Sequence, residues 1–119
     1  LEMLKGFLRA QSETFTVVTG SGSGLQAGLE SGARGAILAV SLFAAPLALE
    51  ILAAHRAGDV ARATAAQAKL APMAHVIVAK LGVPGVKGAV DHVGRVGGFP
   101  RLPLLPLTPA QRAELVAVM

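Results

Sequence analysis

The chain has 119 residues, which is enough for one small domain or part of a larger one, and too few for two. Hydrophobic residues make up 53% of it, a content that excludes intrinsic disorder, and the lack of cysteine excludes a disulfide framework, a thiolate zinc site and a cysteine nucleophile. The net charge of +4 is uneven, because residues 1–60 carry four basic and five acidic side chains whereas residues 61–119 carry seven and two. The basic residues of the second part are spread out, which favours a solvated helical surface over a nucleic-acid interface.

The first predicted element is a helix over residues 1–10, in which Met3, Leu4, Phe7 and Leu8 recur at helical spacing. The sequence opens without methionine and without a charged segment ahead of an apolar stretch, so we expect no signal peptide. Because it opens inside a helix with no capping residue, we also expect the chain to be a fragment of a longer protein.

A β-α-β unit is predicted next. Residues 15–19 are short and β-branched, and residues 35–40 are apolar on both faces, as in a strand of a covered parallel sheet. Between them lie a glycine turn at residues 20–24 and a helix at residues 25–31, ended by Gly32. Two parallel strands alone leave both edges unpaired, so we expect further strands, and we expect them N-terminal to this chain.

From Pro46 onward the pattern is helical. Gly58 is expected to end the first of these helices and Asp59 to cap the next, in which Pro72 predicts a kink or a break. The faces expected to point inward are Leu47, Ile51 and Ala54 in the first helix, and Val60, Ala63, Ala66, Leu70, Met73 and Ile77 in the second.

Two more helices complete the prediction. Pro84 is expected to start one that Gly94 ends, and Thr108 to cap another with Pro109 in its first turn. Residues 97–106, rich in glycine and proline, are expected to form an extended connection between them. The residues expected to face inward in the first of the two are Val86, Ala89, Val90 and Val93.

The glycine turn Gly20-Ser21-Gly22-Ser23-Gly24 is the first candidate site. It fits neither the dinucleotide fingerprint, since its third glycine is displaced, nor a phosphate loop, since no Gly-Lys-Ser/Thr follows. Its central residue is Gly22, so it is not a nucleophile elbow either. A glycine turn after a parallel strand presents backbone N–H groups, which leaves two interpretations open: contact with an anion or carboxylate, or simple turn chemistry.

Other chemistry-bearing residues favour ordinary structural roles. The three histidines, His55, His75 and His92, lack the spacing of a metal site, and Lys80 and Lys87 have the pattern of solvated lysines. The stretch Ala36–Ala54 holds one charged residue and is just long enough to cross a membrane. A proline interrupts it and no aromatic belt flanks it, so these features argue against a membrane span.

Several motifs, at consistent spacing over essentially the whole chain, resemble the C-terminal part of the dihydrodipicolinate synthase/N-acetylneuraminate lyase family. They are Phe15-x-Val17-x-x-Gly20, Gly32-Ala33-x-Gly35-x-Ile37, Pro46, Gly58-Asp59, Pro84, Gly97 and Arg101-x-Pro103-Leu104. Three features are most similar to the 4-hydroxy-2-oxoglutarate aldolase branch: Gly82-Val83-Pro84-Gly85-Val86-Lys87, Val96-Gly97-Gly98, and the serine after Gly20.

The resemblance implies an α/β fold, the C-terminal fragment of a (β/α)8 TIM barrel. Residues 1–57 would hold the end of helix six, strand seven, helix seven, strand eight and helix eight, and residues 58–119 a C-terminal helical extension. The family joins a strand-six lysine to a 2-oxo acid such as pyruvate as a Schiff base, and then makes or breaks a carbon–carbon bond. That lysine is expected upstream of Leu1, so no catalytic residue is expected in this chain and the fragment alone should be inactive.

Three substrate-binding residues are implied by the resemblance. Gly20 corresponds to the strand-seven glycine at the substrate, where a side chain would intrude. Ile37 corresponds to the apolar strand-eight residue that lines the imine pocket, and Ser21 is a polar contact on the same loop. Leu38 and Leu42 depart from the small residue and the asparagine that relatives often carry there.

The function implied is that of a class I aldolase, cleaving 4-hydroxy-2-oxoglutarate to pyruvate and glyoxylate. The alternatives are a condensation of pyruvate with an aldehyde, as in dihydrodipicolinate synthase, or, from a different class, a non-enzymatic helical interaction or membrane-associated module, which a mean hydropathy of +0.60 motivates. The aldolase interpretation implies a 2-oxo acid ligand, the N-terminal part of the barrel as partner, a cytoplasmic homo-oligomer (commonly a tetramer), no cofactor or metal, and neither nucleic acid nor membrane as partner.

Overall fold

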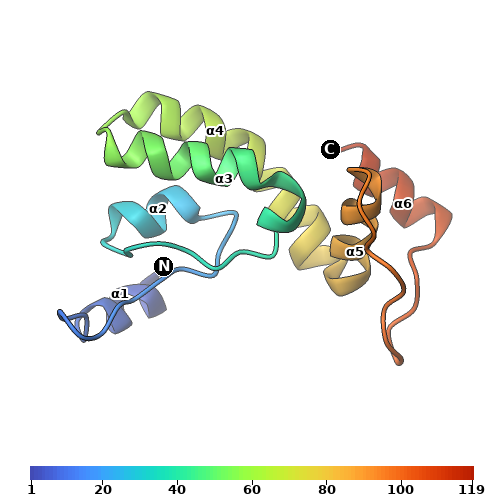
Figure 1. The fold of residues 1–119 in the computed structure, drawn as a ribbon, viewed down its shortest axis with the longest axis horizontal. Coiled ribbons are helices and arrows are strands. Elements are labelled where there is room, and N and C mark those ends of the chain that lie inside the picture. Colours follow the sequence, from blue (N-terminus) through green and yellow to red (C-terminus); the bar gives the residue numbers. More distant parts are fainter.

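The structure is a computed structural model that describes all residues, 1–119. It is elongated, 45 × 31 × 23 Å, and consists of six α-helices and one π-helical segment joined by loops (Figure 1). The elements are α1 (Glu2–Leu8), α2 (Leu25–Glu30), α3 (Ser41–Arg56), α4 (Val60–Met73), η1 (Ala74–Lys80), α5 (Gly82–His92) and α6 (Pro109–Val116).

Helices α3 and α4 lie side by side as a hairpin (Figure 1). Its turn forms as predicted: Gly58 adopts a left-handed φ of +70°, and the carboxylate of Asp59 accepts a hydrogen bond from the backbone N–H of Arg62 at 3.0 Å. The cap satisfies one of the N–H groups that the first turn of a helix leaves without a partner.

Replacing Asp59 by alanine should lower the free energy of unfolding by about 1 kcal/mol, because the Arg62 N–H loses its side-chain acceptor. Asp59→Asn keeps an acceptor oxygen and should cost less than half as much. Thermal unfolding followed by circular dichroism compares the two variants. Equal losses would mean that the cap does not carry the effect.

The two helix-internal prolines alter α3 and α4 in different ways. The helix predicted from Pro46 begins earlier, at Ser41, but Ala44 has non-helical angles (φ −130°, ψ 34°), so a short first turn is kinked against the helix that follows. Pro72 does not end α4; directly after it, residues Ala74–Lys80 continue as the wider π-helix η1. Proline has no N–H to donate to a carbonyl oxygen of the preceding turn, so the regular α-helical hydrogen bonding is interrupted near Pro72, as the sequence predicts.

The C-terminal part forms largely as predicted, except that α5 begins at Gly82, two residues before the predicted start at Pro84. Gly94, with a φ of +79°, follows the end of α5, residues 97–106 are irregular, and Pro109 opens α6. Thr108 and Gln111 form a capping box, in which the Thr108 hydroxyl accepts from the Gln111 N–H at 3.3 Å and the Gln111 side chain accepts from the Thr108 N–H at 2.9 Å.

The core consists of one cluster of thirteen buried residues, contributed mainly by helices α2 to α6 and η1. The predicted inward faces are confirmed at Ile51, Ala54, Ala63, Ala66, Leu70, Ile77 and Ala89, each at most 4% exposed. They are wrong at Val60 and Val93, which are 63% and 39% exposed. Both lie at a helix end, where the face turns away from its neighbours.

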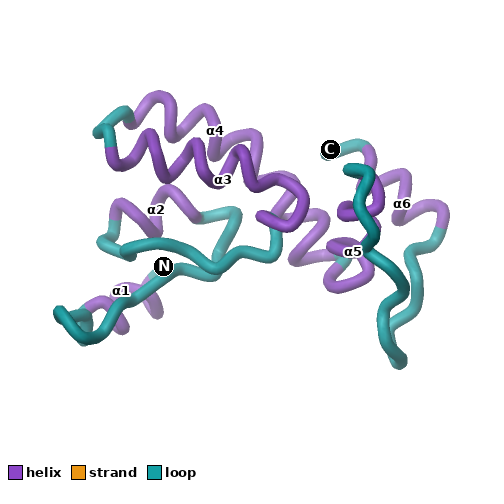
Figure 2. The backbone as a smooth tube through the Cα atoms, viewed as in Figure 1, coloured by secondary structure: helices purple, strands orange, loops and turns teal.

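The two predicted strands are wrong as strands. Residues 15–19 and 35–40 run side by side but share one isolated parallel bridge, between Thr19 and Ala36, and all ordered elements are helices (Figure 2). Three backbone hydrogen bonds join them, if Arg34, the residue directly before the second segment, is included: Thr19 N–H to Gly35 O, Ile37 N–H to Thr19 O, and Arg34 N–H to Val17 O, each 3.0 Å. Direction and register are those of a parallel pair, but neither segment has a second neighbour to extend the ladder.

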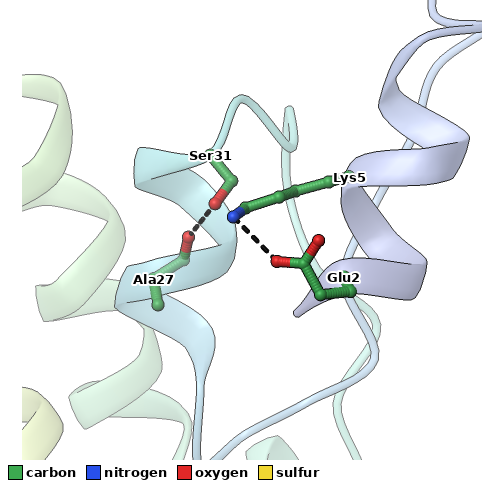
Figure 3. Close-up of polar contacts among 4 residues, drawn as sticks. All are labelled: Glu2, Lys5, Ala27 and Ser31. Atoms are coloured by element: carbon green, nitrogen blue, oxygen red, sulfur yellow. Dashed lines mark hydrogen bonds and ion pairs between the residues drawn. The ribbon is translucent and has the colours of Figure 1, made fainter.

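Helix α1 lies beside α2, and Figure 3 shows one polar contact within α1 and one at the end of α2. Lys5 pairs with Glu2 at 2.9 Å inside α1, and the Ser31 hydroxyl donates to the Ala27 carbonyl at 2.7 Å at the end of α2. The ion pair is exposed, so it contributes little to stability. The predicted helix is confirmed, but its apolar residues Met3 and Phe7 are 78% and 58% exposed.

Candidate functional site

The glycine turn, residues 20–24, connects the first extended segment to α2 and faces the C-terminal helices. Gly20, Ser21, Gly22 and Ser23 line a hollow of about 160 Å³, together with the end of the second extended segment and residues of η1. On its other side, Gly20 and Ser21 help to line a second hollow, of about 370 Å³, beneath α1. The loop therefore lies between two spaces that a small molecule could enter.

Gly22 is the closest point of contact between this loop and the rest of the chain. A Cβ at this position would lie 2.8 Å from the Val40 Cγ1 and 3.1 Å from the Ala74 Cβ. Only glycine lets the loop approach both the second extended segment and η1. The sequence pattern showed the glycines but not this reason for Gly22.

Ser21 lies at the turn with its side chain exposed. Its hydroxyl oxygen accepts a hydrogen bond from the Gly24 N–H at 3.2 Å and lies 3.4 Å from the Ser23 hydroxyl, while its own N–H donates to the Thr19 hydroxyl at 3.3 Å. The sequence left open whether this turn contacts an anion or only forms the hydrogen bonds of a turn. The contacts of Ser21 are of the second kind. Ser23 is the one side chain within hydrogen-bond distance that could accept from the Ser21 hydroxyl.

Gly20 and Ile37 lie next to each other on the open face of the two extended segments. Val17 and Thr19 are buried toward the helices, whereas Gly20 is exposed and Ile37 is 79% exposed. A Cβ at Gly20 would have the Ile37 carbonyl oxygen as its nearest neighbour, at 4.0 Å. The structure thus brings the predicted residues Gly20, Ser21 and Ile37 together, although Ile37 lines neither hollow. Their role in binding a substrate stays a prediction.

Gln67 of α4 is a contact of the loop that the sequence did not single out. Its side-chain amide donates to the carbonyl oxygens of Gly22 and Ser23, at 3.1 and 3.2 Å, and its carbonyl oxygen accepts from the Gln26 N–H at 2.9 Å. The available signal was a polar residue one position after Ala66 and four after Ala63, directly beside the buried stripe of α4.

The two lysines of the C-terminal helices lie away from the loop. Lys80 forms an ion pair with Glu114 of α6. Lys87 donates to the Gly97 carbonyl oxygen at 2.7 Å, so it holds the extended connection rather than being freely solvated. No three His, Cys, Asp or Glu residues lie close enough together to hold a metal ion. None of the helices is both long and apolar enough to span a bilayer.

Comparison with known proteins places this geometry in a family. The sequence profile of the Dihydrodipicolinate synthetase family matches residues 2–119. A dihydrodipicolinate synthase of Bacillus anthracis is 28% identical, with a TM-score of 0.88 over 98% of this chain and 40% of its own. A candidate dihydrodipicolinate synthase of Thermus thermophilus is 33% identical, with a TM-score of 0.86 over 99% and 41%. The N-acetylneuraminate lyase of Proteus mirabilis is 31% identical, with a TM-score of 0.82 over 98% and 40%. The comparison with curated proteins gave no match.

These structures are matched over nearly all of this chain, and the chain spans about 40% of their length. The coarser fold prediction is therefore confirmed: the backbone corresponds to part of a (β/α)8-barrel chain, even though its two extended segments share only one bridge. The profile match, the identities and the superpositions together show that this chain belongs to the dihydrodipicolinate synthase/N-acetylneuraminate lyase family.

Proposed function

We propose that this chain supplies part of the substrate site of a class I aldolase, in which a lysine N-terminal to Leu1 forms the Schiff base with a 2-oxo acid. Membership of the family supports this proposal. The observation that carries it is the open face on which Gly20 and Ile37 lie next to each other, beside the loop that holds Ser21.

Each of the three residues has a physical task in this proposal. The bare backbone at Gly20 lets the substrate lie against the chain, since a side chain there would fill the space it needs. Ile37 provides an apolar wall, and removal of water by such a wall favours the neutral, nucleophilic form of a nearby lysine amine. Ser21 is the polar contact at the turn, because its hydroxyl proton can be donated to a substrate oxygen.

For the substrate we propose 4-hydroxy-2-oxoglutarate, whose C3–C4 bond breaks to release glyoxylate and leave pyruvate on the lysine. The support is the resemblance of residues 82–87 and 96–98 to that branch. In the structure these residues belong to α5 and its connection, where Lys87 holds Gly97, so they support the branch through packing rather than through contact with a substrate.

The alternative is a condensation of pyruvate with an aldehyde. It is favoured by the descriptions of the Bacillus anthracis and Thermus thermophilus relatives, which are 28% and 33% identical to this chain. Both reactions pass through the same pyruvate imine. They are separated by whether the protein releases glyoxylate from 4-hydroxy-2-oxoglutarate.

The assembly is proposed on the same basis. Residues 1–57 would complete the barrel, with residues 58–119 as its helical extension, in a cytoplasmic homotetramer. The division falls in the short turn between α3 and α4.

Borohydride reduction in the presence of pyruvate tests the imine directly. In the full-length protein, we expect one pyruvate adduct, located by peptide mass spectrometry on a lysine N-terminal to residue 1. Residues 1–119 prepared alone should stay unlabelled, since Lys80 and Lys87 are engaged elsewhere. A specific adduct on either of these two lysines would overturn the proposal.

A further inference from the structure

The side-chain amide of Gln67 uses both its ends on the glycine turn and the helix that follows it. Its nitrogen donates to the carbonyl oxygens of Gly22 and Ser23, and its oxygen accepts from the N–H of Gln26. The two partner segments lie 41 to 45 residues before Gln67 in the sequence. One half-buried side chain of α4 therefore fixes a loop that belongs to the first part of the chain.

Helix α2 depends on this contact at its N-terminus. Its N-cap residue is Gly24, which has no side chain to accept a hydrogen bond, and the helix has no side-chain cap. The first turn of a helix leaves its N–H groups without partners inside the helix. Gln67 supplies the missing acceptor to Gln26 from another helix.

The carbonyl groups of Gly22 and Ser23 need hydrogen-bond donors, just as the N–H of Gln26 needs an acceptor. Residues in a tight turn cannot pair with a neighbouring strand, so their carbonyl oxygens need other donors. The nitrogen of Gln67 serves both, at 3.1 and 3.2 Å. Gly22 is at the same time packed against Val40 and Ala74. The conformation of the turn is thus set from the side of the C-terminal helices.

A second contact joins the same two helices. The Gln26 side chain donates to the Thr64 hydroxyl at 3.0 Å and to the Glu30 carboxylate at 2.8 Å. Thr64 lies one turn before Gln67 on α4. The contacts of Gln26 with Thr64 and with Gln67 fix the position of α2 along α4. Of the two α4 residues, only Gln67 also contacts the glycine turn.

We propose that Gln67 is a positioning residue for the substrate site: by holding the turn at Gly22 and Ser23, it sets where the backbone of Gly20 and the hydroxyl of Ser21 lie. This inference rests on the proposed function, because it assumes that the turn contacts the 2-oxo acid. Gln67 itself touches neither hollow that the turn lines. From Gly22, its effect would reach the adjacent Ser21 directly and Gly20 through two residues of backbone.

The test compares Gln67 with Gln11, which makes similar contacts at the other end of α2. The Gln11 amide donates to the Gly32 carbonyl oxygen at 3.1 Å, and its oxygen accepts from the Val17 N–H at 3.0 Å. Glutamate at either position keeps the acceptor and replaces the donor by an oxygen that faces a carbonyl oxygen. Gln67→Glu and Gln11→Glu therefore make the same chemical change, and only the first makes it at the glycine turn.

In the full-length protein, Gln67→Glu should raise the KM for the 2-oxo acid about tenfold and slow borohydride trapping of pyruvate at low concentration. Trapping at saturating pyruvate should return to the parent yield, because the lysine is unchanged. Gln11→Glu should lower the unfolding temperature to a similar extent and leave KM within twofold of the parent, because Thr19, which lies between Val17 and Gly20, is held by its own backbone hydrogen bonds to Gly35 and Ile37. Gln67→Met, which removes all three hydrogen bonds without adding charge, should also raise KM.

The outcomes separate the two proposals. If the parent protein forms no pyruvate adduct, the proposed function fails before Gln67 is tested. If the parent is trapped and both glutamate variants change KM equally, or neither does, the positioning role of Gln67 is wrong while the proposed function stands.

Discussion

Replacing Gly85 by alanine should lower the free energy of unfolding by about 3 kcal/mol. Gly85 is buried where α5 packs against η1. A Cβ there would overlap the carbonyl oxygen of Ile77 and lie 2.5 Å from the Cβ of Leu81. Neither atom can move by rotation of a side chain, so the two helices would have to separate.

Gly88 is the matched control, one turn further along α5 and also buried. A Cβ at Gly88 would lie 2.8 Å from the Leu107 Cδ1 and 3.3 Å from the Leu115 Cδ1. Both are the ends of flexible side chains, which can change rotamer, so Gly88→Ala should cost only about 1 kcal/mol. Urea unfolding of both variants measures the difference. Losses of equal size would contradict the distinction between backbone and side-chain contacts.

Features that depend on neighbours in the sequence could be predicted. The caps at Asp59 and Thr108 and the end of α5 before Gly94 formed as expected. In each of them the determining group lies within three residues of the backbone group that it satisfies or of the turn that it permits. The sequence of such a segment contains nearly the whole interaction.

The two extended segments show the opposite case. Their composition is that of buried parallel strands, and the three hydrogen bonds between them have parallel register. A segment becomes a regular strand, however, only when neighbouring strands pair with it, and two segments alone do not provide enough neighbours. The exposed residues Val18, 40%, and Ile37, 79%, are on the face that further strands and side chains would cover in a barrel. Local sequence specified the direction of the segments but could not supply the neighbours.

The candidate site likewise contains residues that could be predicted from the sequence and one that could not. Gly20, Ser21 and Ile37 could be named from the family resemblance, and the turn and the bridge bring them together. Gln67 could not, because its contacts join residues more than 40 positions apart and become visible only when α4 packs against α2. The position of Gln67 beside the buried residues Ala63 and Ala66 marks it as near the core, but the sequence does not say which distant groups it contacts. The packing of the C-terminal helices is thus part of what shapes the glycine turn.

Gly20→Ala should abolish most substrate binding while leaving the fold intact. The position has room for a methyl group, since its nearest neighbour would be the Ile37 carbonyl oxygen at 4.0 Å, and its φ lies outside the left-handed region. We therefore expect the free energy of unfolding to change by no more than about 0.5 kcal/mol. In the full-length protein, the same methyl group should occupy the space of the 2-oxo acid and reduce kcat/KM about 100-fold.

Gly35→Ala is the control for this variant. Gly35 lies on the second extended segment, two residues before Ile37, and a Cβ there would meet only the Val18 Cγ1, at 3.9 Å. It is at the amino end of its segment, where its carbonyl oxygen accepts from the Thr19 N–H, whereas barrel enzymes bind substrate at the carboxyl ends of their strands. The rate of pyruvate trapping by borohydride should thus fall for Gly20→Ala and stay at the parent value for Gly35→Ala. Full trapping by Gly20→Ala would show that the substrate does not approach this backbone, because the added methyl group has no other neighbour through which it could act.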